Sequence, residues 1–174
     1  AMALGAAKYL ANTRRFNGTV HFIFQPSEEN MQGGPAMIAD GLFEKFKIDR
    51  LYAMHNIPGL PKGVLHFHDG ETMSAVDNWE IELIGKGSHG SMPELSIDPV
   101  VAGSSLVMAL QTIISRNISP WDNGVVTIGA FLAGNEGNVI ANSAILRLSM
   151  RNMQAETRVK VLDRIRKITA AQAE

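Results

Sequence analysis

The chain has 174 residues, of which 45% are hydrophobic and 19% charged, with a formal net charge of −1. This composition is that of a globular protein with one large or two small domains, and it gives no basic surface for nucleic acid or an anionic membrane. Without cysteine, a metal site must use His, Asp and Glu, and we expect a cytoplasmic protein.

Neither a membrane span nor a signal peptide is expected from the sequence. No run of consecutive apolar residues approaches the roughly 20 that a membrane-spanning helix needs. No charged region followed by an apolar one begins the chain. The first residue is not methionine, and the helical patterns at 1–11 and 155–174 lack a starting cap and a closing glycine. We therefore expect a piece of a longer protein.

Residues 1–74 alternate between helical and strand patterns, which predicts an α/β fold with part of a parallel-sheet catalytic domain. The expected helices are 1–11 and 35–40, and the expected strands are 19–24, 50–54 and 64–68. Pro26 should end the first strand, and Gly41 should close the second helix. Parallel strands deliver the residues that follow them to one edge of a sheet.

Two carboxylates follow the first expected strand, in the turn Gln25-Pro26-Ser27-Glu28-Glu29-Asn30. Neighbouring residues of an extended turn point different ways, so one carboxylate can hold a metal while the other faces bound water. A solvated acidic loop is the alternative. His55 ends the strand 50–54, and an imidazole beside a carboxylate suits zinc, manganese or cobalt. The alternative for His55 is a histidine bonded to backbone.

Residues 75–174 follow a different pattern. A strand at 79–84 leads through a glycine-rich loop to a helix over 98–116, then to strands at 125–132 and 144–150 and a helix at 155–174. The order β-α-β-β-α is that of a ferredoxin-like domain without its last strand. One edge of the sheet should therefore be unpaired.

Six motifs follow one another in an order that resembles the dinuclear metallo-aminoacylase/carboxypeptidase family. The nearest branch holds hippurate hydrolases and N-acyl-amino-acid amidohydrolases of the auxin-conjugate type. The resemblance covers essentially the whole chain. The motifs are Gln25-Pro26-Ser27-Glu28-Glu29, Met54-His55, Gly85-Lys86-Gly87-Ser88-His89-Gly90, Asp98-Pro99, Gln111-Thr112-Ile113-Ile114-Ser115-Arg116 and Asn138-Val139-Ile140.

The resemblance implies catalytic and metal-binding roles for four residues. Glu28 corresponds to the general base that takes a proton from metal-bound water, and Glu29 and His55 correspond to metal ligands. His89 corresponds to a histidine of a small lid domain that reaches the partner subunit's active site and stabilises the oxyanion. The full-length enzyme would bind two divalent ions. The remaining ligand motifs of the family have no counterpart within residues 1–174.

Two residues in the second half correspond to binders of the substrate carboxylate. Asn138 and Arg151 have the family's spacing of thirteen positions, and a guanidinium can bond both carboxylate oxygens. A surface arginine is the alternative for Arg151. Ala141 stands where the family often has proline, which weakens the match in this loop.

The function implied is metal-dependent hydrolysis of N-acyl amino acids such as hippurate-like substrates, by a homodimer paired through the lid domain. A metal can lower the pKa of bound water from 15.7 to about 7. A glutamate carboxylate, with an ordinary pKa near 4.3, is a weak base and can deprotonate water only when the pKa of that water is lowered in this way. The alternatives are a non-catalytic dimerisation or regulatory fragment and a dipeptidase or carboxypeptidase of the same fold. The isolated chain is expected to be inactive. We place the domain boundary between residues 74 and 75.

Overall fold

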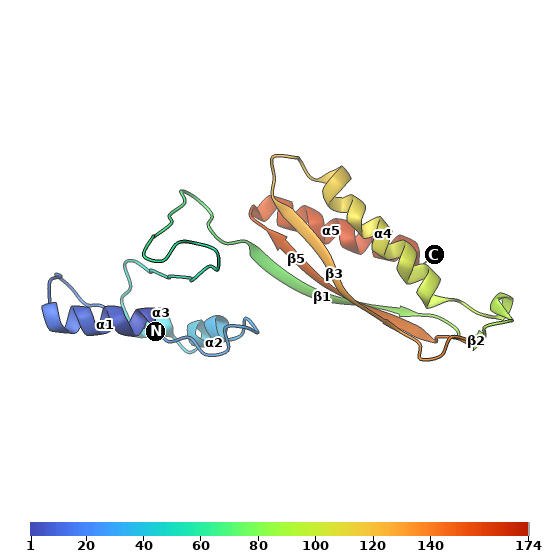
Figure 1. The fold of residues 1–174 in the computed structure, drawn as a ribbon, viewed down its shortest axis with the longest axis horizontal. Helices are drawn as coiled ribbons and strands as arrows, with labels where there is room; N and C mark the ends of the chain where they lie inside the picture. Colours follow the sequence, from blue (N-terminus) through green and yellow to red (C-terminus); the bar gives the residue numbers. More distant parts are fainter. Residues whose placement is uncertain (174) are drawn as a thin grey trace. The chain divides into compact units, whose positions relative to one another are not determined.

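A computed structural model describes residues 1–173, and the chain divides into two compact units, Ala1–Val64 (unit 1) and Leu65–Glu174 (unit 2). Figure 1 labels the helices and strands of each unit. The division falls in the segment that precedes the first strand, which begins at residue 75.

Unit 1 contains three helices, α1 (Met2–Thr13), α2 (Gly33–Ala39) and α3 (Leu42–Lys45). The end of α2 at Gly41 confirms the sequence prediction. The N–H of Gly41 donates to the carbonyl of Ile38, and its φ of 86° is left-handed, a conformation that glycine adopts without steric cost. Helix α3 was not predicted, because four residues are too few to show helical periodicity.

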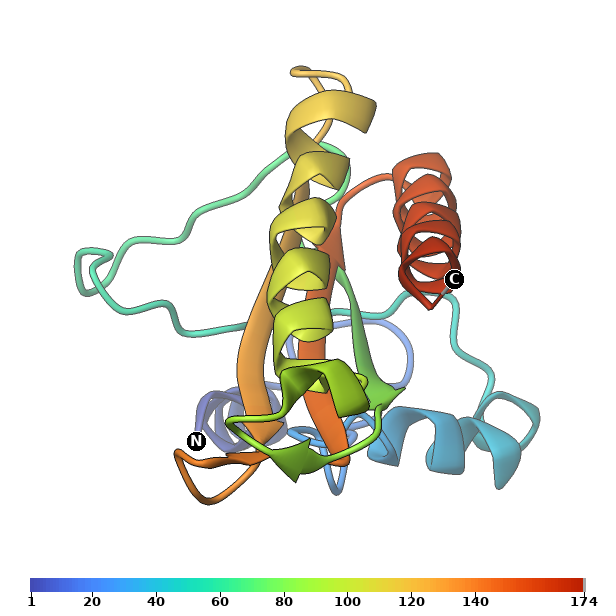
Figure 2. The ribbon, with the colours of Figure 1, turned by 90° about the vertical axis from the view of Figure 1, so that its right-hand side faces the viewer.

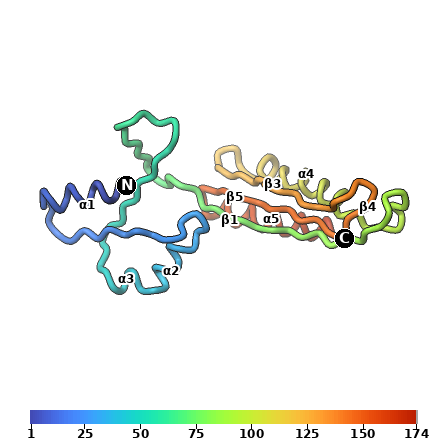
Figure 3. The backbone as a smooth tube through the Cα atoms, turned by 60° about the horizontal axis from the view of Figure 1, so that its bottom comes forward, coloured from blue at the N-terminus to red at the C-terminus, as the bar shows by residue number. Residues whose placement is uncertain are grey.

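The three strands predicted in the first part of the chain are wrong. Residues 19–24, 50–54 and 64–68 take part in no strand pairing within the described residues, and Figure 3 shows irregular backbone between α1 and α2 and between α3 and β1. Their β-branched and aromatic residues favour strands, but a segment forms a stable strand only when an adjacent strand pairs with its backbone hydrogen-bonding groups. The expected parallel sheet is therefore not formed by unit 1 alone.

Unit 2 has the predicted order of elements. Strands β1 (Ala75–Ile84), β3 (Gly124–Ala133) and β5 (Ser143–Asn152) form an antiparallel sheet in the order β1-β5-β3. Helices α4 (Pro99–Asn117) and α5 (Ala155–Gln172) lie side by side on one face of this sheet (Figure 2). The strand order leaves one edge of β1 and one edge of β3 unpaired among the described residues, where the sequence led us to expect a single unpaired edge.

The core of unit 2 lies between the sheet and the two helices. On the central strand β5, every second residue from Ala144 to Asn152 is buried, as the period of a strand with one covered face requires. Leu106, Leu110 and Ile113 of α4 and Val161 and Ile165 of α5 complete this core.

The beginning of α4 follows from its sequence. Asp98 caps the helix, and its Oδ1 accepts hydrogen bonds from the N–H groups of Val100 and Val101 at 2.8 and 3.3 Å. Pro99 stands at the first helical position, where its missing N–H costs nothing. Helix α4 is long and apolar enough to cross a membrane by length and composition alone. The sequence analysis did not detect this, because it considered only runs of consecutive apolar residues. Because its buried face packs on the sheet, we interpret α4 as a core helix.

An ion pair joins the beginning of β1 to the first turn of α5. The Nε and Nη2 of Arg158 donate to the two carboxylate oxygens of Asp77 at 2.7 and 2.6 Å. These hydrogen bonds hold the pKa of Asp77 below its usual value. Further along α5, the guanidinium of Arg166 stacks 4.7 Å from the centre of the Trp79 ring. Both contacts hold α5 against β1.

Candidate active-site residues

Glu28 and Glu29 lie in an exposed turn that leads into α2. The turn is folded tightly: the carbonyl of Ser27 accepts from Gln32 and Gly33, and Ser27 itself has a φ of 50°. A Cβ on Gly33 would lie 1.5 Å from the carbonyl oxygen of Pro26, so only glycine fits where the turn closes. Neither carboxylate makes a side-chain hydrogen bond within residues 1–173, which leaves both free to meet a metal or water.

His55 is held by backbone at one of its two ring nitrogens. Its Nδ1 lies 2.8 Å from the carbonyl oxygen of Asn56. If Nδ1 donates this bond, the lone pair of the neutral ring is on Nε2, the arrangement usual for a metal-ligating histidine. The backbone alternative raised by the sequence and the ligand role are thus compatible.

The structure does not assemble these residues into a metal centre. Among the described residues, no group of three or more His, Asp or Glu side chains is placed to hold an ion. The sheet edge that was expected to collect Glu28, Glu29 and His55 is absent from unit 1. Each residue is present with the right chemistry, but their convergence stays a prediction.

In unit 2, the structure brings His89 and Asn138 together. Strand β2 (Ser88–His89) pairs with β4 (Val139–Ile140), with His89 opposite Val139. The N–H of Gly90 donates to the carbonyl of Asn138 at 2.7 Å. Two residues that lie 49 positions apart in the sequence are therefore neighbours at one end of the unit.

The hydrogen bonds of His89 determine which nitrogen carries its proton. Its Nδ1 lies 3.2 Å from the backbone N–H of Ser91 and 2.7 Å from the hydroxyl of the same residue. A backbone N–H can only donate, so Nδ1 accepts and the neutral ring carries its proton on Nε2. The exposed His89 thus presents an N–H donor, the group that stabilises a developing oxyanion.

The glycine-rich loop holds its position by close backbone contact. A Cβ on Gly87 would lie 2.6 Å from the carbonyl oxygen of Ile140, and the N–H of Gly87 donates to Oδ1 of Asn142 at 2.9 Å. Asn142 also accepts through its carbonyl from Gly85 at 2.8 Å. The sequence analysis assigned no role to Asn142. The available signal was an amide residue just after the loop that carries Asn138.

Arg151 lies near the opposite end of the central strand. It faces Val76 of β1 and Val125 of β3 and is exposed. Eight residue steps of β5 separate it from Ser143, at the end where Asn138 lies, and at roughly 3.3 Å per residue this is about 26 Å. One chain therefore does not bring Asn138 and Arg151 together.

Comparison with known proteins identifies the family. Peptidase family M20/M25/M40 matches residues 1–164, which includes all six candidate residues. The chain belongs to this family. It is 45% identical over 163 residues to hippurate hydrolase of Campylobacter jejuni, covering 94% of this chain and 42% of that protein. It is 38% identical over 170 residues to N-acetylcysteine deacetylase of Bacillus subtilis, covering 97% of this chain and 44% of that protein.

A solved structure resembles the fold of this M20 chain. The YXEP protein of Bacillus subtilis, a dinuclear metal binding peptidase of family M20, superposes with a TM-score of 0.71 at 31% identity. The match covers 98% of this chain and 42% of that one. The chain spans less than half the length of the curated relatives that it matches. A divalent metal fits the donors Glu29 and His55 by type, since carboxylate oxygen and imidazole nitrogen suit such ions.

Proposed function

We propose that the complete protein hydrolyses the amide bond of N-acyl amino acids, releasing a carboxylic acid and an amino acid. The observation that carries this proposal is the pairing of β2 with β4. This pairing makes His89 and Asn138 neighbours along the backbone, which supports an oxyanion donor and a substrate-binding amide at one end of unit 2. The hippurate hydrolase and the deacetylase named above support the substrate class.

Residues of unit 1 would perform the proton transfers. Glu29 and His55 would hold divalent metal, and bound metal supplies water of lowered pKa as the nucleophile. Glu28 would take a proton from the attacking water molecule while the oxygen of that water bonds to the acyl carbon. Glu28 then gives the proton to the amide nitrogen as the C–N bond breaks, so the products are a carboxylic acid and an amine.

Residues of unit 2 would bind the substrate carboxylate, which the reaction leaves unchanged, and the acyl oxygen, which becomes negatively charged during the reaction. The Nε2–H of His89 donates to the oxygen of the acyl carbon as it becomes negative. Asn138 and Arg151 bind the carboxylate of the substrate, Arg151 through two parallel hydrogen bonds. Because about 26 Å of strand separates these two residues within a chain, one substrate must take them from two copies. A homodimer satisfies this requirement.

The test is complementation between two inactive full-length proteins. His89→Ala and Glu28→Gln are each expected to lose nearly all hydrolysis of a hippurate-like substrate. After subunit exchange, random pairing makes half of the dimers mixed, each with one intact site, so about a quarter of wild-type activity should return. His68→Ala, which removes an exposed histidine without a proposed role, is the control and should remain active.

Two results would contradict the proposal. If exchange is demonstrated and both variants stay inactive, His89 does not act in the site of a partner. If the wild-type protein cleaves dipeptides but no N-acyl amino acid, the substrate class is wrong while the assigned residues can stand.

A further inference from the structure

The ring of His89 is bound to a tight turn that begins at its own backbone. The N–H of Met92 donates to the carbonyl of His89 at 2.9 Å, which closes a turn over residues 89–92. Within this turn, the backbone N–H of Ser91 donates to Nδ1 of His89. Aspartate and asparagine side chains stabilise turns by accepting from the N–H two residues further on. The imidazole of His89 takes the same place here.

Ser91 offers this nitrogen a second donor, its hydroxyl. The hydroxyl oxygen lies 2.7 Å from Nδ1, and the backbone nitrogen of the same residue lies 3.2 Å from it. The first distance is the usual one for a hydrogen bond from O–H, whereas the second is at the long end of the range for N–H. Because the backbone N–H makes Nδ1 an acceptor, the hydroxyl donates to it. The hydroxyl of Ser91 therefore makes the shorter of the two bonds to the ring.

The backbone of the turn has a fixed place beside the loop of Asn138. The N–H of Gly90, between His89 and Ser91, donates to the carbonyl of Asn138 at 2.7 Å, and a Cβ on Gly90 would lie only 3.0 Å from that oxygen. The hydroxyl of Ser88 donates to the carbonyls of residues 89 and 92 at 3.2 and 3.0 Å. These bonds fix the backbone of His89 and leave its side chain to rotate.

The contact with Ser91 restricts that rotation. Within residues 1–173, the hydrogen bonds of the His89 ring all go to Ser91. The ring is planar and rigid, so holding Nδ1 also sets the direction of Nε2, which carries the proton of the neutral ring. Without the hydroxyl, an exposed imidazole can turn about its side-chain bonds or move its proton to Nδ1. A donor stabilises an oxyanion best when it is aimed before the charge develops.

We propose that Ser91 is a positioning residue for His89. Its hydroxyl holds Nδ1 as an acceptor, so that the Nε2–H is present and aimed before a substrate arrives. This inference rests on the role of His89 in the proposed function. Ser91 lies one residue beyond the glycine-rich motif that carries the family resemblance, and the sequence analysis gave it no role.

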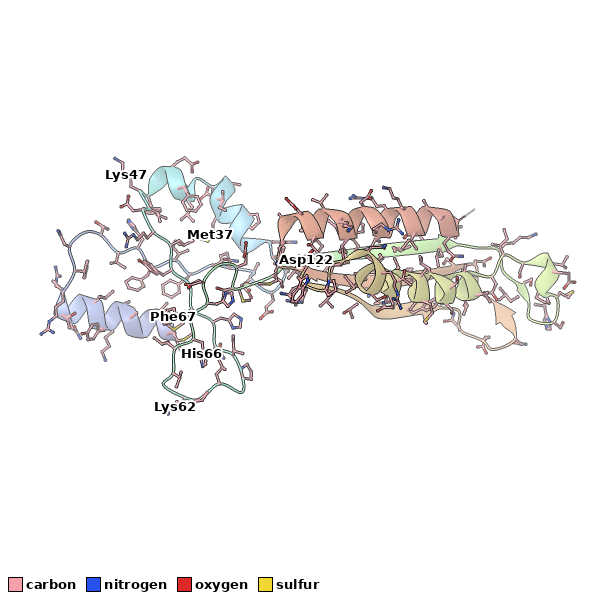
Figure 4. All side chains as sticks on the ribbon, turned by 90° about the horizontal axis from the view of Figure 1, so that it is seen from above. Met37, Lys47, Lys62, His66, Phe67 and Asp122 are labelled. Carbon is pink, nitrogen blue, oxygen red and sulfur yellow. The ribbon has the colours of Figure 1, made fainter. Side chains whose placement is uncertain are left out.

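Nitrogen NMR of the ring tests the contact itself. The 174-residue chain is labelled with ¹⁵N-histidine and measured at a pH where imidazole is neutral; the signals of His89 are those missing from His89→Ala. The wild-type ring should show a protonated Nε2 and an unprotonated Nδ1. In Ser91→Ala the two signals should move toward each other, because the two tautomers then exchange. Figure 4 labels the exposed His66, in the segment between α3 and β1, whose signals should not change.

Kinetics of the complete protein test the consequence. Ser91→Ala should lower kcat for a hippurate-like substrate roughly tenfold and leave KM unchanged, because the oxyanion exists only after the substrate has bound. The loss is smaller than the 10²–10³ that follows removal of an oxyanion donor, since the N–H is still correctly aimed part of the time.

Two variants serve as matched controls. Ser91→Thr keeps the hydroxyl and adds a methyl group to an exposed side chain, so its ring signals should match the wild type and its kcat should stay within about twofold. Ser96→Ala removes a hydroxyl of the same loop that donates to the carbonyl of Pro93 at 2.6 Å. It should keep both the ring signals and the kcat of the wild type.

The outcomes separate this inference from the proposed function. Unchanged ring signals in Ser91→Ala would overturn the inference and leave the role of His89 standing. Changed signals with an unchanged kcat would confine Ser91 to the structure of the turn, as would a rise in KM or a loss that threonine does not restore. Full activity in His89→Ala would overturn the proposed function, and the positioning role with it, whatever the NMR shows of the contact.

Discussion

Gly87→Ala should release the loop of His89 without unfolding unit 2. The new Cβ would lie 2.6 Å from the Ile140 carbonyl oxygen, whereas ordinary contact begins at 3.4 Å, so the loop must move away by about 0.8 Å. Ile140 contributes backbone, which cannot turn aside. The hydrogen bond from Gly87 to Asn142, now 2.9 Å, would stretch to about 3.7 Å and be lost.

The expected cost follows from these two effects. Overpacking costs about 1–3 kcal/mol, and a lost hydrogen bond costs about 1 kcal/mol. Together they amount to about 2–4 kcal/mol of local cost, and the lower bound of about 2 kcal/mol already corresponds to roughly 30-fold more frequent opening. Because β2 and β4 lie outside the core, global stability should change little.

Native-state hydrogen exchange measures this difference. Protection of the Gly90 amide, which donates to Asn138, should fall by a factor of at least about 30, while the amide of Leu106 in the core keeps its protection. Gly137→Ala is the control, because a Cβ there would meet nothing within 4 Å. Unchanged protection at Gly90, or an equal loss at Gly90 and Leu106, would refute the reasoning.

Three further predictions concern charge and metal. In the complete enzyme, Glu28→Gln should keep metal by elemental analysis and lose about 10²–10⁴ in rate, whereas Glu29→Gln should lose metal; equal metal loss in both would reverse the assignment. Calorimetric titration of this chain with zinc should show weak binding, because Glu29 and His55 are its only two assigned ligands; submicromolar binding of two ions would contradict this. The lowered pKa of Asp77 contributes stability above about pH 4 that is lost as the pH falls through the folded-state value. Asp77→Asn should therefore flatten the acid limb of the melting temperature against pH, and an unchanged limb would show that the pair with Arg158 does not matter.

Local signals in the sequence were sufficient for the long helices and strands of unit 2. Asp98 and Pro99 indicated the beginning of α4, and the alternation from Trp79 to Leu83 indicated β1, because each of these patterns is complete within one element. The strand 19–24 was predicted by the same kind of signal and was wrong. Its residues favour a strand, but no strand pairs with it among the described residues.

The candidate site depended on contacts that local patterns do not contain. That His89 lies beside Asn138 follows from the pairing of β2 with β4, two strands of two residues each, too short to show periodicity. The proton position on His89 depends on Ser91, and the loop depends on Asn142. The resemblance named His89, Asn138 and Arg151 by position, and it did not show that one strand separates the last two.

The length of β5 has a consequence for how the activity depends on protein concentration. If a substrate needs Asn138 from one chain and Arg151 from another, no site exists in a lone chain, however well folded. Specific activity should then fall on dilution through the dimer dissociation constant, with no change in the fold of either unit. In a cell that makes both intact and His89-defective chains, each mixed dimer would keep one working site, the one in the defective chain, because that site receives His89 from its intact partner.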